Sequence, residues 1–118
     1  MKNQERTAIL NLLGISQKGR LLSAGKEAVT ISLQKHKAFL LIVSEDISVN
    51  SKEKLLKICL RNKIPCLEFG SGEDIGRSVG RGRIAAVAIN NRKMAETIAG
   101  KIKKLHGAET MGVDEWPK

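Results

Sequence analysis

Two uninterrupted apolar runs constrain the fold of this 118-residue chain more than any other feature. They cover Ala38–Val43 and Ile84–Ile89, and a shorter segment that is apolar except for Glu68 covers Cys66–Phe69. A strand with one face in water alternates apolar and polar residues, whereas a strand covered on both faces is apolar throughout. The runs therefore predict strands of a sheet that lies between two layers of helices.

Amphipathic segments separate these runs and predict five helices. We expect Ser51, Ser71 and Asn91 to cap the third, fourth and fifth of them. A short strand or turn is expected at Arg20–Ser23, before the second helix. The order of elements predicts an α/β fold with parallel strands and helices on both faces, and the length suits one domain. The expected helices cover residues 4–18, 24–36, 51–62, 72–79 and 91–105.

The charge is strongly positive and unevenly spread. The chain has 21 Lys and Arg against 12 Asp and Glu, a formal charge of +9. Residues 109–118 hold three acids and one base, so residues 1–108 carry +11. A surface this basic favours a polyanionic partner, above all a nucleic acid, because neutralised phosphates release counterions. A basic protein with no polyanionic partner is the alternative.

Several classes of protein are excluded or disfavoured. No apolar run approaches the roughly 18–20 residues of a membrane span. Cys59 and Cys66 occupy apolar positions without zinc-site spacing, which indicates buried thiols and a cytoplasmic protein. The stretch Gly70–Gly76 follows a strand and opens a helix, but it lacks the glycine spacing of a dinucleotide fingerprint and the Lys-Ser/Thr of a P-loop.

No set of residues suggests catalysis. The histidines, His36 and His106, lie far apart without a nucleophile beside either, and Glu45-Asp46 after the first long strand has no partner carboxylate nearby in sequence. We therefore expect a protein that is not an enzyme and that uses no metal or cofactor.

Basic residues gather around two segments instead. Lys26, Lys35 and Lys37 bracket the second helix, and Arg81 and Arg83 lie in the loop before the last strand. If that strand lies parallel beside Phe39–Val43, the loop comes near Gly25 and the positive end of the second helix dipole, which forms one basic edge. Simple solvation of two unrelated faces is the alternative.

The aromatic content bears on the kind of nucleic acid. Only Phe39, Phe69 and Trp116 are aromatic, and both Phe residues lie in expected core strands. Proteins that bind single strands usually stack bases on aromatic side chains. Recognition of a folded RNA by its shape is therefore the better hypothesis.

The succession of motifs resembles a known family. The segments are GKEAVTISLQKHKA, an apolar strand ending VSED, a helix ending RNKIPC, and GEDIGRSVGRGRIAAVAI. Together they are similar to the ribosomal-protein superfamily that binds kink-turn RNA, the L-seven-Ae-like proteins, and in particular to its small bacterial members of the YlxQ type. The likeness covers about residues 9–105. It implies a single-domain three-layer α/β/α sandwich with a central mixed, mainly parallel sheet.

The resemblance also implies where RNA would bind. In the family, a motif of Gly, Asn, Glu and Lys lies at the start of the second helix. In this chain the corresponding residues are Gly25, Glu27, Ala28 and Ile31, so that only the glycine is kept. A further family basic residue falls on Lys35. The family loop that grips flipped-out bases falls on residues 82–85. With the basic residues above, the expected RNA-binding set is Gly25, Lys26, Glu27, Lys35, Lys37, Arg81, Gly82, Arg83, Ile84 and Ala85.

These motif departures leave two hypotheses for function. An ionised Glu27 only accepts hydrogen bonds and repels phosphate, so it cannot replace an Asn directly. We expect a non-catalytic, monomeric protein that binds a kink-turn or similarly bent or bulged RNA linked to ribosomal or regulatory RNA, with the ribosome as a further candidate partner. The alternative is a protein–protein interaction module on the same fold. The expected domain covers residues 1–106, followed by an acidic tail, 107–118, that contains Trp116.

Overall fold

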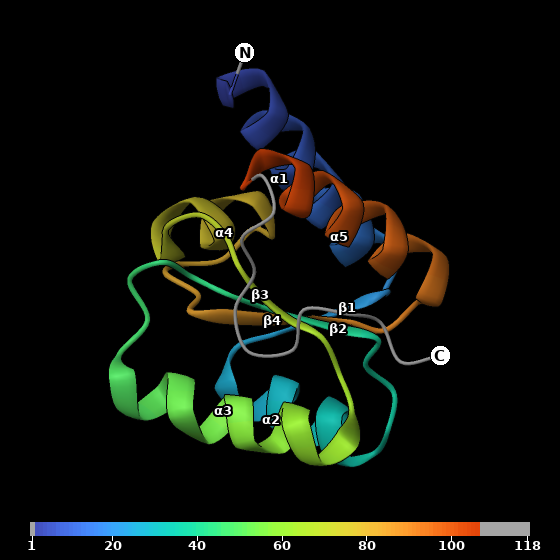
Figure 1. Ribbon diagram of the computed structural model, residues 1–118. Coiled ribbons are helices and arrows are strands. Elements are labelled where there is room, and N and C mark those ends of the chain that lie inside the picture. The colour runs from blue at the N-terminus through green and yellow to red at the C-terminus, as the bar shows by residue number, and fades with distance from the viewer. Residues whose placement is uncertain (1, 107–118) are drawn as a thin grey trace.

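Four short strands form one sheet between two layers of helices in the computed structural model, which describes residues 2–106 (Figure 1). Helices α2 and α3 cover one face, and α1, α4 and α5 cover the other. The expected three-layer α/β/α sandwich is confirmed, and the expected tail with Trp116 lies outside the described residues. The elements are α1 Lys2–Lys18, β1 Leu22–Ala24, α2 Lys26–Gln34, β2 Leu40–Val43, α3 Val49–Asn62, β3 Cys66–Glu68, α4 Gly72–Ser78, β4 Ala86–Ile89 and α5 Arg92–Leu105.

The sheet has the strand order β1-β4-β2-β3 and is mixed, as expected. The expectation that it is mainly parallel is wrong, because only β2 and β3 pair in parallel, and β4 runs antiparallel to both β1 and β2. A parallel strand needs a crossover that returns the chain to the opposite end of the sheet. Here the loop after the short α4 folds back over that helix, where the Arg81 N–H donates to the Gly76 carbonyl at 2.7 Å. The chain therefore enters β4 at the end where β3 finished.

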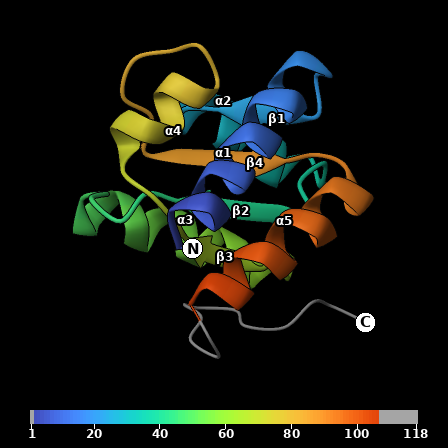
Figure 2. The ribbon, with the colours of Figure 1, turned by 90° about the horizontal axis from the view of Figure 1, so that it is seen from above.

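Each strand contributes side chains to two separate cores, because successive residues of a strand point to opposite faces. In β2, Leu40 and Ile42 pack beneath α1, α4 and α5, whereas Leu41 and Val43 pack against α2 and α3. All four are fully buried. The apolar runs are thus explained by a sheet with no face in water. In the view from above, α1 lies between α4 and α5 (Figure 2).

The helix starts agree with the sequence at two of three expected caps. The Ser71 hydroxyl accepts from the Asp74 N–H at 3.0 Å, and the Asn91 side chain accepts from the Met94 N–H at 2.8 Å. The expectation that Ser51 caps α3 is wrong. Ser48 is the cap, and its hydroxyl accepts from the N–H of Ser51, which already lies in the first turn.

Two glycines allow close approach of α4 to its neighbours. A Cβ at Gly14 would lie 2.9 Å from the Ser78 carbonyl oxygen, which explains a glycine within α1. A Cβ at Gly76 would overlap the carbonyl of Gly82. The loop after α4 can therefore pack on this helix only because residue 76 has no side chain.

A buried polar chain ties α2 to the sheet. The Ser32 hydroxyl donates to Asn90 Oδ1 at 2.6 Å, and Asn90 Nδ2 donates to the Ser23 hydroxyl at 2.9 Å. Ser32 is 3% exposed, so its hydroxyl depends on Asn90 for a partner. This chain fixes α2 relative to β1 and to the end of β4.

The two ends of the sheet carry different loops. At the carboxyl end of β2 lie the starts of α2 and α3 and the loop before β4. At the amino end of β2 lie the ends of α1, α2 and α3 and the start of α5. Figure 1 shows the carboxyl end at the left and the amino end at the right.

Candidate nucleic-acid interface

The loop before β4 meets the start of α2 at the carboxyl end of β2. The Gly25 N–H donates to the Ala86 carbonyl oxygen at 3.0 Å, and Ala24 pairs with Val87. The proximity was expected from parallel strands, but it arises from antiparallel pairing of β4 with β1. These two segments form one continuous backbone surface.

The start of α2 has no side-chain cap. Gly25 precedes the helix with φ 92° and ψ 158°, a conformation that glycine adopts without strain. Ser48, Ser71 and Asn91 cap α3, α4 and α5, so α2 is the exception among these four helices. The N–H groups of its first turn have no partner within the helix, and they lie at the positive end of its dipole. This end of α2 is suited to an anion or to a base-edge acceptor.

The positions at which the chain departs from the family motif all lie on the surface. Glu27 and Ala28 are exposed in the first turn of α2, and Ile31 is 51% exposed one turn later. An isoleucine with half its surface in water is unusual in a helix that buries Val29 and Leu33. The replaced residues therefore change the surface and not the core.

A groove of about 570 Å³ separates α2 from α3 beside this surface. Lys26 and Lys54 lie along it, one from each helix. Sequence reasoning missed Lys54, because helical periodicity places it on the outside of α3 without indicating which helix packs beside α3. The groove is lined by Lys26, Glu27, Thr30, Ile31, Ser51, Lys54, Leu55 and Ile58.

Arg83 joins the loop before β4 to the loop after β2. Its Nη2 atom lies 3.4 Å from the Asp46 carboxylate and donates to the Asp46 carbonyl oxygen at 3.2 Å. The Arg83 and Asp46 side chains are 61% and 42% exposed. The guanidinium is therefore positioned by Asp46 and still accessible from solvent.

Asp46 also supports the start of α4. Its Oδ1 atom accepts from the Gly72 N–H at 3.0 Å. The nearby Ser44 hydroxyl, the Gly72 N–H and the charge of Arg83 together hold the pKa of Asp46 below its usual value of 3.8. Ser44 Oγ is buried without a hydrogen bond of good geometry, so Gly72 and Arg83 provide the well-formed contacts. Asp46 thus has a structural role.

The other loop residues differ in what they present. Arg81 is exposed, and its backbone N–H is held by Gly76. Ile84 is only 8% exposed, because its N–H donates to the Gly72 carbonyl and its side chain enters the core. The Ala85 carbonyl accepts from the Ser44 N–H at 2.8 Å. Among the expected RNA-binding residues of this loop, Arg81 and Arg83 have accessible side chains, whereas Ile84 anchors the loop in the core.

Lys35 and Lys37 lie elsewhere. They follow the last residue of α2, and a helix of nine residues rises about 13 Å. The structure therefore places both lysines at the amino end of β2, away from Gly25, Lys26 and the loop before β4.

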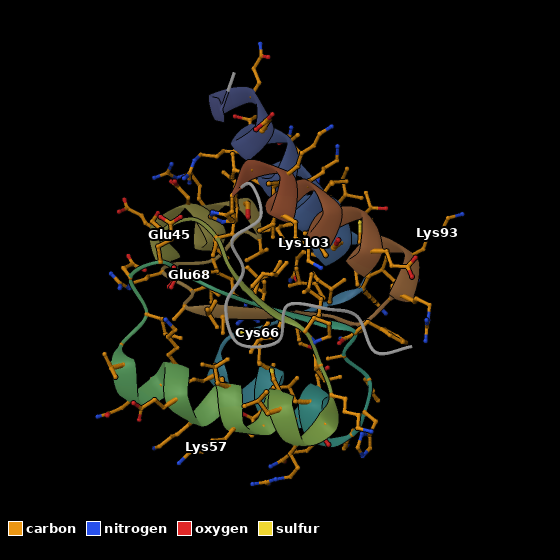
Figure 3. All side chains as sticks on the ribbon, in the orientation of Figure 1. Glu45, Lys57, Cys66, Glu68, Lys93 and Lys103 are labelled. Atoms are coloured by element: carbon orange, nitrogen blue, oxygen red, sulfur yellow. The ribbon has the colours of Figure 1, made fainter. Side chains whose placement is uncertain are left out.

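The remaining polar candidates have structural roles. Glu73 and Asp74 pair with Arg77 in α4, as expected for a helix start and not for a phosphate site. Cys59 and Cys66 are free and buried, and the neighbouring Cys66 thiol together with burial raises the pKa of Cys59 (Figure 3 shows Cys66 between the sheet and α3). Among residues 2–106 no group of three or more His, Cys, Asp or Glu could hold a metal. In the same part of the chain no helix is long and apolar enough to span a membrane.

Comparison with known proteins identifies the family. The model of the ribosomal protein L7Ae/L30e/S12e/Gadd45 family matches residues 7–99, so the chain belongs to this family. It is similar to the RNA-binding protein YlxQ of Enterococcus faecium, with 27% identity over 103 residues that cover 85% of this chain and 100% of that protein. It is also similar to RNA-binding protein YlxQ of Bacillus subtilis (strain 168), with 28% identity over 87 residues, 74% of this chain and 87% of that protein.

Solved structures show the same fold. A protein of unknown function from Bacillus halodurans has a TM-score of 0.77 and 28% identity, over 80% of this chain and 96% of that one. The 15.5kD RNA binding protein of Giardia lamblia has a TM-score of 0.73 and 19% identity, over 86% of this chain and 90% of that one, which is a likeness of fold alone. The expected family and its YlxQ-type likeness are confirmed. The family and the names of these relatives also confirm the expectation that the protein is not an enzyme.

Proposed function

We propose that the protein is a cytoplasmic, non-catalytic RNA-binding protein that recognises a kink-turn or similarly bent or bulged RNA, of ribosomal or regulatory origin. The observation that carries the proposal is the uncapped start of α2, which the Gly25–Ala86 hydrogen bond joins to the loop before β4. The RNA-binding names of the YlxQ relatives support the ligand class. The free, buried thiols agree with a reducing compartment.

The proposed interface combines backbone donors with flexible cations. Lys26 and Arg81 are exposed in the two segments that the Gly25–Ala86 contact joins and can neutralise phosphates, while the first N–H groups of α2 donate to the RNA. Arg83 provides a forked guanidinium whose direction Asp46 sets, which suits a base edge or a phosphate.

The interface also differs from the family motif in a way that lowers its expected affinity. Glu27 can accept from the amino group of a base but cannot donate, and Ile31 offers apolar contact in place of a cation. A lost base contact typically costs about 1–3 kcal/mol. We therefore expect kink-turn binding weaker by two or more orders of magnitude than a complete motif would give, with Lys26 and Lys54 offsetting part of the loss.

One observation favours a second candidate function. The groove between α2 and α3 has an exposed Ile31 on its wall and a volume of about 570 Å³. An apolar groove of this kind also suits a helix or peptide of a protein partner. A protein–protein interaction module with weak, non-specific RNA binding is this second candidate.

Binding measurements distinguish the two candidates. The dissociation constants for a short kink-turn RNA and for a straight duplex of equal length are compared across a salt series. Preference for the kinked RNA at every salt concentration supports the proposal. Equal affinities with a steep salt slope contradict it, since they leave only non-specific electrostatics.

A double variant tests the interface itself. Lys26→Ala with Arg83→Ala is expected to weaken binding of the kinked RNA selectively. Lys57→Ala with Lys101→Ala is a control that removes the same charge from exposed positions on α3 and α5 (Figure 3 shows Lys57 on the outer side of α3). If the control pair has the larger effect, the proposed interface is wrong.

A further inference from the structure

Cations also gather at the opposite end of the sheet. Here β1 and β2 begin, β4 finishes and α5 starts, since Leu22 and Leu40 both pair with Ile89. Figure 3 shows Lys93 projecting from the start of α5 at this end, whereas Glu45 and Glu68 lie toward the other. We define the amino-end surface by six exposed residues: Arg20, Lys35, Lys37, Lys63, Arg92 and Lys93.

The acidic residues are distributed in the opposite way. Glu45, Asp46 and Glu68 lie at or near the carboxyl end of β2, where they pair with Arg6, Arg83 and Lys52. In the described part of the chain, no carboxylate forms an ion pair with any of the six cations of the amino-end surface. The acid closest to them in sequence is Glu96, one turn into α5. Within residues 2–106, this end of the sheet therefore carries an excess of positive charge.

Helix stability does not account for this charge. A cation near a helix C-terminus is favourable, which explains the positions of Lys35 and Lys63. Arg92 and Lys93 instead occupy the first turn of α5, where the helix dipole disfavours cations and which holds no acidic residue. Two of the six cations thus lie where the helix dipole disfavours them.

The backbone at this end is unusual as well. Three non-glycine residues within the described chain have positive φ, namely Arg20 at 61°, His36 at 57° and Lys63 at 58°. Each follows the end of a helix, where glycine is usually found because it has no Cβ to strain this conformation. All three lie on or beside the amino-end surface, so basic or imidazole side chains stand at positions that favour glycine.

Two of the six cations, Lys63 and Arg92, line a small hollow. His36, Phe39, Lys63 and Arg92 are among the residues that line a space of about 190 Å³. The Arg92 guanidinium lies 5.3 Å from the centroid of the Phe39 ring, within the range of a cation–π contact. This contact orients the Arg92 guanidinium at the edge of the hollow. His36 and Lys63, which also line the hollow, can donate hydrogen bonds to an anion.

We propose that the amino-end surface is a second RNA-binding surface, which contacts the phosphate backbone of a duplex arm. Six cations on four separate segments match a chain of regularly spaced phosphates better than they match one compact anion. The α2 helix, about 13 Å long, separates this surface from the Gly25–Lys26 interface. A bent RNA can therefore contact both ends of the sheet. The inference rests on the proposal that the protein binds RNA.

A charge-matched pair of triple variants tests this surface. Lys37→Gln, Lys63→Gln and Lys93→Gln remove three charges from it, and Lys57→Gln, Lys101→Gln and Lys104→Gln remove three charges from exposed positions elsewhere. The probes are a kink-turn RNA with short arms and the same RNA with one arm extended as a duplex. Circular dichroism and thermal unfolding establish that both variants fold.

The salt dependence of binding is the readout. The slope of log K against the logarithm of the salt concentration is negative, and each lost phosphate contact reduces its magnitude by about 0.7–0.9. On the extended RNA, the amino-end variant is expected to lose about 2 units of slope, and the control variant less than 1. An equal loss in both variants overturns the inference, because bulk charge then explains the binding. Loss of binding to anionic vesicles, with unchanged RNA binding, would assign the surface to a membrane and overturn it too.

Failure of the proposed function is a separate result. If wild-type protein binds kinked and straight RNA equally, the kink-turn proposal fails. The two triple variants are still compared on a straight duplex, and a larger slope loss in the amino-end variant continues to support this second surface. If the wild-type protein binds the kink-turn RNA selectively and the two triple variants lose the same amount of salt slope, the result supports the first interface and rejects the second.

Discussion

The Asp46 carboxylate lies 3.4 Å from the Arg83 guanidinium and accepts the N–H of Gly72, so that one side chain joins the loop before β4, the loop after β2 and the start of α4. The candidate interface at the start of α2 depends on this arrangement, because the same pair directs Arg83. The strength of the Asp46–Arg83 ion pair depends on the charge of Asp46 and thus on pH.

Replacing Asp46 with Asn is expected to lower stability at pH 7 and to have a smaller effect at pH 3, below the ordinary pKa of an aspartate. The pKa of Asp46 is below 3.8 in the folded protein, so its ionised form is favoured by folding. This contribution is present above the unfolded pKa and is lost as the pH falls through the folded pKa. Urea unfolding at both pH values measures it. Glu53→Gln, at an exposed acid with no ion pair among the described residues, is the control.

Gly76→Ala is expected to destabilise the protein by about 2 kcal/mol or more, because overpacking of a tight contact typically costs 1–3 kcal/mol and here the obstacle is backbone. Its Cβ would overlap the Gly82 carbonyl. Gly100→Ala in α5 is the matched control, since a Cβ there meets nothing within 4 Å. That change should stabilise by about 0.5–1 kcal/mol through helix propensity. Similar urea midpoints for the two variants would show that the loop does not pack on α4 as described.

Asn90→Ala should cost about 1–3 kcal/mol, because the buried Ser32 hydroxyl loses its acceptor. It also removes the donor to Ser23. Chemical denaturation measures the loss, with Asn11→Ala on the exposed side of α1 as a control of near-zero effect. A neutral Asn90→Ala variant would mean that α2 is held by its apolar contacts alone.

Restoring the family side chains should improve kink-turn binding. Glu27→Asn with Ile31→Lys is expected to raise the affinity about tenfold or more, since one base contact contributes about 1–3 kcal/mol. Glu53→Gln with Leu60→Lys changes the net charge by the same amount at exposed positions of α3. It controls for long-range electrostatic attraction to the RNA. An equal gain in both double variants, measured by fluorescence anisotropy, would show that Glu27 and Ile31 do not contact RNA.

Periodicity predicted the layers of this fold because the signal is local. The Ala38–Val43 and Ile84–Ile89 runs correspond to β2 and β4, although each strand starts later than its run. Strand direction is not encoded in such runs, so the antiparallel placement of β4 could not be predicted from them. It follows from the packing of the loop after α4 on Gly76, which is a contact between backbones.

The candidate site was predictable to a similar extent. Gly25, Lys26 and Arg83 were identified from charge, helix position and family resemblance, and the structure brings their segments together. Lys54 was missed because it joins the groove only through the packing of α3 beside α2. Lys35 and Lys37 were assigned to the same edge, but they follow a helix about 13 Å long that carries the chain to the opposite end of the sheet.

The loop after α4 is restrained before any ligand arrives. Arg81 is held to Gly76, Ile84 to Gly72 and Arg83 to Asp46, so nearly every residue of the loop has a fixed neighbour. A segment that is already ordered loses little conformational entropy on association, whereas a mobile one must be immobilised. Affinity at this interface is then governed by contacts and charge, and variants there should differ in dissociation rate more than in association rate.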